Sequence, residues 1–404
     1  MLGGVLLSAV LLLGCGVAQP AAKGEADVKI CVVCSAGDLK WKSGMEDVAD
    51  AFMKENEHIQ VELNFLPEIK NQTYVERLKV LAAENEFYDV LELRETDTMA
   101  EAGLLAPLPE EVYSLTDRPR IDNGSCFGVP RFTTTLGIIY NQELFDKLGL
   151  SKPKDYEEFL ELCGKLKNAG YDPLAIGSAD IWHMKFWGNY LFRNYIMAAD
   201  GSADWSAERV EPMLKCFRDL TIRGYIDTRY RNVSDSQTAQ EVSTGRAAMV
   251  YTGPWMLSQI ENLNQQIQLG FFFLPGNDGT AYAMEDRNVE WGISAKTVAD
   301  EAKMAAAVKF LQFYYSEGVY ETILEIMNAD PVTVRPIHMP DTRNQQIMEA
   351  AYSDHPTQTS VLVENAGASD GFVAYYEQTL QEALWGRESI ASLAEKLAEK
   401  WEEP

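Results

Sequence analysis

The strongest constraint on the fold is an alternation of strand-like and helix-like segments that begins at residue 28. Residues 28–34 are largely apolar, as in a buried strand, and a helix pattern with its apolar positions on one face follows. Residues 59–65 alternate between apolar and polar, a second helix pattern comes next, and residues 89–93 form a short strand. The order strand–helix–strand–helix–strand is typical of a parallel sheet with crossover helices.

The alternation starts again after residue 130. Residues 128–140 are rich in β-branched and aromatic side chains, and helix and strand patterns then follow one another to a last helix over residues 390–397. A chain of 404 residues is too long for one hydrophobic core. We therefore expect two α/β lobes connected by strands. Three expected helix starts have capping-box spacing: Ser43 with Glu46, Thr73 with Glu76, and Asp155 with Glu158.

The net charge of −26 argues against nucleic-acid binding, because an acidic surface repels phosphate backbones. The sequence also lacks the Gly-x-Ser-x-Gly, P-loop, His-Glu-x-x-His and dinucleotide-binding motifs. We therefore expect no catalytic residues and no cofactor. A histidine-centred metal site is not expected either, because the four histidines are far apart in the sequence: His58, His183, His338 and His355.

The first 14 residues are uncharged, mostly apolar and too few to span a bilayer. They have the length and small-residue ending of a secretory signal, and the junction Leu12-Leu13-Gly14-Cys15 resembles a bacterial lipobox. We expect a signal peptide over residues 1–14, lipidation of Cys15 and a lipid-anchored tether over residues 15–26. The protein would then be held at the outer face of the cytoplasmic membrane, on the periplasmic side if there is an outer membrane. The alternative is an ordinary signal peptide with an incidental cysteine.

Five cysteines remain after the tether, an odd number without tight clustering. Cys31 and Cys34 have the spacing of a redox pair, but they fall in a strand, where residues three apart face opposite sides. Buried free thiols are the favoured interpretation. The five are Cys31, Cys34, Cys126, Cys163 and Cys216.

Five segments, in order, resemble family 1 extracellular solute-binding proteins of ABC importers, the group that contains maltose-binding protein. The most specific is Gly-Arg-Ala-Ala-Met-Val-Tyr-Thr-Gly-Pro-Trp over residues 245–255. The others are residues 52–65, 88–93 with 100–108, 126–150, and 291–297 with 328–334.

The resemblance implies a two-lobed α/β periplasmic-binding-protein fold of the type II kind, with a mainly parallel sheet in each lobe. Hinge strands should cross near residues 131–136, 291–295 and 331–340. The amino lobe would comprise residues 27–133 plus 295–335, and the carboxy lobe residues 134–294 plus 336–404. The implied function is capture of a mono- or oligosaccharide by a monomer, with delivery to a membrane permease and no chemistry.

The ligand should lie where the strands end, since α/β sheets bind ligands outside their carboxyl ends. Gly253 and Pro254 force a turn after the strand at residues 247–251, which leaves Trp255 at the cleft edge. An indole packs against the C–H face of a sugar ring, while the hydroxyls need polar partners. The alternative places Trp255 in the core beneath the turn.

Further ligand-binding candidates follow from the same argument. Some follow strands, some lie beside the predicted hinge crossings, and one belongs to an aromatic cluster after residues 174–177. For the adjacent Arg–Glu pair the alternative is a surface ion pair, and for the helical tryptophans it is a place in the core. The candidates are Asp38, Trp41, Arg94, Glu95, Trp182, Glu290, Trp291 and Arg335.

Other functions remain open at this point. A protein with the same fold could bind a polyamine, which would use the acidic surplus, or another small polar solute. It could also serve as a sensor or adhesin. An exported glycoside hydrolase, with two carboxylates flanking the scissile bond, is the enzymatic alternative.

Overall fold

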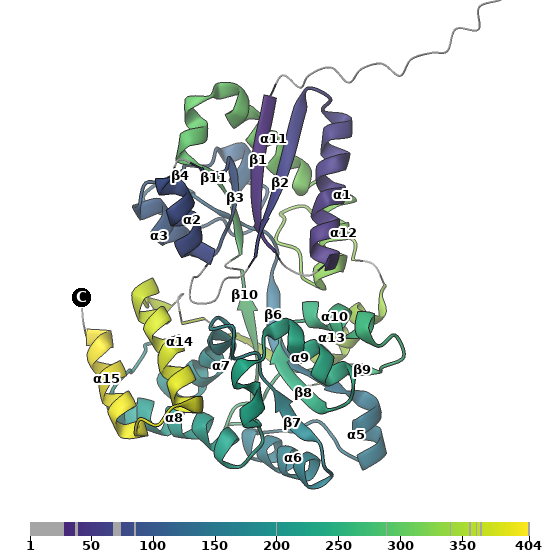
Figure 1. Cartoon of the computed structure of the whole chain (residues 1–404), viewed down its shortest axis with the longest axis vertical. Helices are drawn as coiled ribbons and strands as arrows, with labels where there is room; N and C mark the ends of the chain where they lie inside the picture. The colour runs from purple at the N-terminus through teal and green to yellow at the C-terminus, as the bar shows by residue number, and fades with distance from the viewer. Residues whose placement is uncertain are drawn as a thin grey trace, which may run out of the picture.

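The computed structural model describes residues 28–36, 39–67, 74–84, 86–198, 200–287, 289–339, 341–354, 357–360, 362–363 and 366–402. They form two lobes, each built on its own mixed sheet with helices packed around it (Figure 1). The prediction of a two-lobed α/β fold is therefore confirmed. The expectation of a mainly parallel sheet in each lobe is wrong, because β11 in the first sheet and β6 in the second pair antiparallel with all their described neighbours. No helix in the described ranges combines the length and the apolar character needed to cross a bilayer.

The sheet of the first lobe has the order β2-β1-β3-β11-β4, and β5 also pairs with β11. β2 and β3 are parallel to β1, whereas β11 is antiparallel to β3. The strands are β1 (Val28–Ser35), β2 (Ile59–Leu66), β3 (Val90–Leu93), β4 (Leu105–Ala106), β5 (Val129–Pro130) and β11 (Glu290–Ser294).

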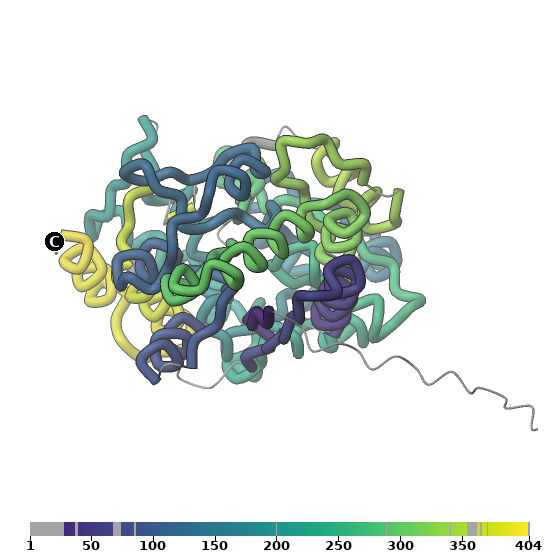
Figure 2. The backbone as a smooth tube through the Cα atoms, turned by 90° about the horizontal axis from the view of Figure 1, so that it is seen from above, coloured from purple at the N-terminus to yellow at the C-terminus, as the bar shows by residue number. Residues whose placement is uncertain are grey.

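Helices from two separate parts of the sequence, before residue 114 and between residues 295 and 327, cover this first sheet. Phe52 of α1 packs against Phe310 of α11 with ring centroids 5.3 Å apart, so the two helices share one core. Figure 2 looks down on this lobe and shows α11 beside the amino-terminal segments. The helices of the lobe are α1 (Leu39–Glu55), α2 (Tyr74–Ala83), α3 (Thr96–Glu101), α4 (Glu110–Tyr113), η3 (Ala295–Ala299), α11 (Glu301–Tyr314) and α12 (Val319–Met327).

The second sheet has the order β12-β10-β6-β8-β7, and β9 also pairs with β6. Its strands are β6 (Thr134–Asn141), β7 (Asp172–Ala175), β8 (Ala247–Thr252), β9 (Leu269–Phe272), β10 (Ala281–Asp286) and β12 (Thr357–Ser360). Its helices are α5 (Gln142–Leu148), α6 (Tyr156–Asn168), α7 (His183–Leu191), η1 (Phe192–Ile196), α8 (Ala207–Ile222), η2 (Thr228–Asn232), α9 (Asp235–Ser243), α10 (Trp255–Leu263), α13 (Arg343–Asp354), α14 (Asp370–Trp385) and α15 (Ile390–Glu402).

Three crossing segments connect the lobes: residues 131–133, the link from β10 to β11, and the link from α12 to α13. They are bonded to one another: Thr133 and Asp330 exchange backbone hydrogen bonds of 2.9 and 2.8 Å, and the Arg131 N–H donates to the Val289 carbonyl at 3.0 Å. Any rotation of one lobe against the other must therefore occur about these hydrogen-bonded crossing segments.

The predicted lobe boundaries need two corrections. β11 pairs with β3, with Glu290 opposite Leu93, so residues 290–294 belong to the first sheet and not to the carboxy lobe. Ile337 and Met339 pack on the core of the first lobe, so that lobe also extends beyond residue 335. Both shifts depend on long-range contacts, which the periodicity of a segment does not reveal.

The predictions of helix starts were only partly correct. Asp155 caps α6 as predicted, because its carboxylate accepts from the Glu158 N–H at 2.8 Å. The start predicted at Ser43 is wrong: α1 begins at Leu39, which places Ser43 inside the helix. Thr73 lies outside the described residues.

The carboxyl ends of β7 and β8 in one sheet, and of β1 and β3 in the other, face the junction between the lobes. β6 begins directly after the first crossing, and its Gly137 lies opposite Thr252, the last residue of β8. β7 is parallel to β8 and so ends on the same side. In the first sheet, Leu93 at the end of β3 lies opposite Glu290, directly after the second crossing, and β1 is parallel to β3. The site expected at strand ends therefore lies between the two sheets.

The five cysteines in the described residues are all free thiols. Cys31 and Cys34 both lie in β1, and burial raises the pKa of each thiol, so neither has the low pKa of a reactive cysteine. The interpretation as free thiols agrees with this environment.

Candidate functional site

On the carboxy-lobe side, three aromatic rings lie at the ends of β7 and β8. Trp255 opens α10, and its ring centroid is 5.7 Å from that of Phe186. The Phe186 centroid is in turn 5.4 Å from that of Trp182. Phe186 is buried, whereas both tryptophans are partly exposed. We call Trp182, Phe186 and Trp255 the aromatic wall.

The position of Trp255 depends on the glycine before the turn. A Cβ atom on Gly253 would lie 1.7 Å from a ring carbon of Trp255, so any other residue would displace the indole. The sequence prediction of a turn after β8 is confirmed, since β8 ends at Thr252 and α10 starts at Trp255. That Trp255 contacts a ligand remains a prediction.

The aromatic wall is supported by polar side chains beneath it. His183 is fully buried, and its Nε2 lies 2.7 Å from Oδ1 of Asp235, the first residue of α9. Asp180 accepts a hydrogen bond of 2.7 Å from the Asp235 N–H. These contacts attach the start of α7, next to Trp182, to the start of α9.

On the amino-lobe side, Glu92 is a fully buried carboxylate in β3. It accepts hydrogen bonds from Arg131 Nη1 at 2.6 Å, Ser35 Oγ at 2.7 Å and Arg94 Nη2 at 3.2 Å. We call these four residues the Glu92 network. Arg94 and Ser35 lie at strand ends, so the network presents polar groups to the junction, whereas Arg131 lies in the first crossing.

Both ions of the central pair are charged despite their burial. Burial by itself raises the pKa of Glu92, but Arg131, Arg94 and the Ser35 hydrogen bond outweigh it, so the pKa lies below the usual value. Burial lowers the pKa of Arg131, and the negative charge of Glu92 more than compensates.

Trp41 and Trp291 support Arg131. The guanidinium carbon of Arg131 is 3.9 Å from the ring centroid of Trp41 and 5.2 Å from that of Trp291. Trp41 is only 3% exposed and Trp291 is 0% exposed. The assignment of Trp291 to the cleft is therefore wrong in this conformation, because a side chain without exposed surface cannot touch a ligand. Trp41 likewise has almost no exposed surface with which to contact a ligand.

The remaining candidates are dispersed. Glu290 is nearly buried, accepts a hydrogen bond from the Thr96 hydroxyl and lies 3.5 Å from an Arg120 nitrogen, and burial raises its pKa. Glu95 is partly exposed directly before α3. Arg335 is exposed and pairs with Glu317 at 3.0 Å, within the first lobe. Asp38 lies outside the described residues.

Sequence reasoning did not identify Glu92, Arg131, Phe186 or Asp235. One signal was present: a glutamate inside the apolar run of β3 must find a partner if that strand is buried on both faces. The partner itself, 39 positions further along the chain, had no local signal.

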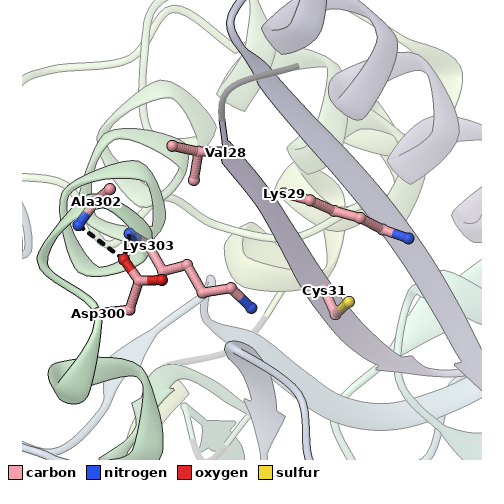
Figure 3. Close-up of a pocket in the computed structure, with 6 residues that line it drawn as sticks. All are labelled: Val28, Lys29, Cys31, Asp300, Ala302 and Lys303. Atoms are coloured by element: carbon pink, nitrogen blue, oxygen red, sulfur yellow. Dashed lines mark hydrogen bonds between the residues drawn. The ribbon is translucent and has the colours of Figure 1, made fainter. Parts of the chain in front are cut away.

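A pocket in the first lobe lies away from this junction. It is found between the start of β1 and the start of α11, lined by Val28, Lys29, Cys31, Asp300, Ala302 and Lys303 (Figure 3). Its charged groups already have partners: Asp300 caps α11, Lys29 pairs with Glu62, and Lys303 lies 3.2 Å from Asp89. Its place at the amino end of β1 separates it from the candidate site.

Metal binding has no support in the described part of the chain, where no three His, Cys, Asp or Glu side chains form a group that could hold an ion. The arrangement instead offers an aromatic surface on one lobe and hydrogen-bonding groups on the other. Such a pair of surfaces is suited to holding a neutral polar molecule with apolar faces.

Residues 38–321 match the family model of bacterial extracellular solute-binding proteins. The chain belongs to this family. The resemblance noted in the sequence is thereby confirmed, and the family consists of binding proteins that act outside the cell.

One curated relative of this solute-binding protein, and several solved structures, are distant in sequence but cover nearly its whole length. The multiple sugar-binding protein of Streptococcus mutans serotype c is 20% identical over 383 residues, which cover 88% of this chain and 87% of that protein. A chitin oligosaccharide binding protein has a similar structure, with a TM-score of 0.80, 22% identity and coverage of 93% of this chain and 98% of that one. A maltose-bound protein of T. maritima gives a TM-score of 0.73 at 17% identity, covering 93% of this chain and 99% of that one.

Proposed function

We propose that this solute-binding protein captures a carbohydrate between the aromatic wall and the Glu92 network and delivers it unchanged to an ABC transporter permease. The observation that carries the proposal is the pairing of a partly exposed aromatic surface on one lobe with Ser35 and Arg94 on the other. Sugar rings present C–H faces that pack on indoles, and their hydroxyls pair with hydroxyl and guanidinium groups.

Two features support an oligosaccharide over a single sugar. Trp182 and Trp255 each pack against Phe186, so the wall contains two partly exposed indoles. The named relatives bind multiple sugars, chitin oligosaccharides and maltose. A chain of sugar rings fits such a wall better than one ring does.

Ligand binding should close the lobes around the crossings. A sugar that touches both lobes stabilises the closed conformation over the open one, because only the closed form makes both sets of contacts. The permease then distinguishes the two forms. The protein needs no second copy for this scheme and acts as a monomer.

A thermal-shift panel tests the proposed function. At a ligand concentration 100 times Kd, binding to the native state adds about 2.7 kcal/mol of stability, so the melting temperature should rise with a di- or oligosaccharide. The panel also includes polyamines, because these cations would be attracted by the excess of acidic residues. A shift with a polyamine and none with any sugar would contradict the proposal. Recovery of a hydrolysed sugar after incubation would instead identify a glycoside hydrolase.

Membrane attachment through Cys15 is part of the same proposal, since a receptor held near its permease delivers ligand efficiently. Replacing Cys15 with serine should move the protein from the membrane fraction to the medium, or to the periplasm of a cell with an outer membrane, because lipid alone would hold it. Cell fractionation followed by immunoblotting measures this. Cys31→Ser is the matched control and should stay in the membrane fraction. Equal membrane retention of both variants would exclude lipidation at Cys15 as the anchor.

A further inference from the structure

Asn328 ends α12 in a backbone conformation that few residues adopt. Its φ of 47° and ψ of 46° lie in the left-handed region, where glycine and asparagine are favoured at the ends of helices. Glycine would serve this purpose equally well. The side chain of Asn328 is therefore available for a second purpose.

That side chain reaches from the first lobe to the second. Asn328 Nδ2 donates to the Pro254 carbonyl at 3.2 Å and to Ser258 Oγ at 2.9 Å. Pro254 and Ser258 belong to the first turn of α10, on either side of Trp255 in the sequence. One amide group thus holds the turn that carries Trp255 of the aromatic wall.

The first turn of α10 has no capping side chain of its own. Pro254 occupies its N-cap position, in contrast to α6 and α9, which are capped by Asp155 and Ser234. The Asn328 amide does not replace a capping side chain, because it donates to oxygens, whereas the free groups at a helix start are N–H donors. It instead restrains the turn from outside the helix. Asn344 of α13 also donates to Ser258 Oγ, at 3.3 Å, and to Glu261 at 3.2 Å, so its amide contacts α10 beyond Pro254. The Pro254 carbonyl belongs to the peptide unit that joins Pro254 to Trp255, so a hydrogen bond to it restrains the backbone from which the indole projects.

We propose that Asn328 is a positioning residue for Trp255: its amide fixes the Pro254–Ser258 turn and thereby the indole that stacks on the sugar. This inference rests on the proposed function. Asn328 lies two residues before Asp330, which exchanges backbone hydrogen bonds with Thr133 of the first crossing. The position of Trp255 is therefore also coupled to the segments about which the lobes rotate.

Asn328→Gly tests this directly, since it keeps the left-handed backbone and removes only the amide. We expect sugar affinity, measured by calorimetry, to fall about 3- to 10-fold, as for loss of one or two ordinary hydrogen bonds. Asn123→Gly is the matched control: Asn123 has a φ of 48°, lies in an exposed turn and is far from α10 in the sequence. Its affinity should stay within about twofold of the wild type.

A double-mutant cycle separates positioning from general weakening. If Asn328 acts through Trp255, Asn328→Gly should change affinity by less than about twofold once Trp255 is already alanine. The inference would be overturned if the losses of affinity in the two single variants added up in the double variant. It would also be overturned if the wild type bound sugar and Asn328→Gly bound it equally tightly.

A second readout does not need a sugar. Amide hydrogen exchange in the apo protein should be faster at residues 255–258 in Asn328→Gly than in Asn123→Gly. Equal exchange rates would refute a role in holding the turn. If the wild-type protein bound no sugar at all, the proposed function would fail while this measurement still decided whether Asn328 holds Trp255.

Discussion

Replacing Trp255 with alanine should weaken carbohydrate binding by about 10- to 100-fold, as calorimetry would show. The indole is partly exposed at the end of β8 and forms one end of the aromatic wall. Removing it deletes apolar surface that a sugar ring would cover, and full burial of a large apolar side chain is worth roughly 1.5–3 kcal/mol. Each 1.4 kcal/mol corresponds to about tenfold in affinity.

The unfolding free energy of the apo variant distinguishes a ligand platform from a core residue. Trp187, which is 1% exposed, provides the comparison, because truncation of a core tryptophan costs about 3–5 kcal/mol. Trp255→Ala should be destabilised much less than Trp187→Ala, and Trp255→Phe should retain part of the affinity. Strong destabilisation of Trp255→Ala with unchanged affinity would place Trp255 in the core.

Breaking the ion pair between Glu92 and Arg131 should cost about 3–5 kcal/mol of unfolding free energy, as much as truncation of a core tryptophan. Both side chains are at most 3% exposed, and Arg131 lies against Trp41 and Trp291. Arg131→Met leaves the carboxylate of Glu92 buried without its main partner, and Glu92→Gln does the same to the guanidinium. Urea unfolding of the apo proteins measures both.

The double variant Glu92→Gln/Arg131→Met is the control for this pair. It should be less destabilised than the sum of the single variants, because neither charge is then left alone. A cost below about 1 kcal/mol for either single substitution would show that the pair is dispensable.

The same pair predicts a pH dependence. Since the pKa of Glu92 is lowered in the folded protein, its stabilisation is complete above the ordinary glutamate value of about 4.3. It is lost as the pH falls from there through the lowered folded-state value. Urea unfolding at a series of acidic pH values should therefore show a smaller loss of stability for Glu92→Gln than for the wild type.

Local sequence patterns were sufficient to predict an element when its hydrophobic period and its flanking residues indicated the same structure. The turn at Gly253 and Pro254 and the cap at Asp155 could be predicted because each depends on residues within a few positions. The start of α1 could not, since a capping-box spacing at Ser43 occurs by chance inside a longer helix. The prediction that Arg94 directly follows a strand also needed only the order of elements.

Burial of individual aromatic residues could not be predicted in the same way. Trp255 and Trp291 both adjoin predicted strands, yet Trp255 is partly exposed and Trp291 is completely covered. The difference arises from partners distant in the sequence: Trp291 is covered by Arg131 and Tyr314, whereas Trp255 has a glycine beneath its ring.

The sequence by itself determined the α/β class, the two lobes and the turn that presents Trp255, because helical and strand periods and glycine–proline turns are local properties. The tertiary structure alone decided which sheet β11 joins, which carboxylate is paired with Arg131 and which amide reaches Pro254. These depend on pairing between segments separated by 39 to about 200 positions, and such pairing is set by the packing of the whole chain and not by any segment of it.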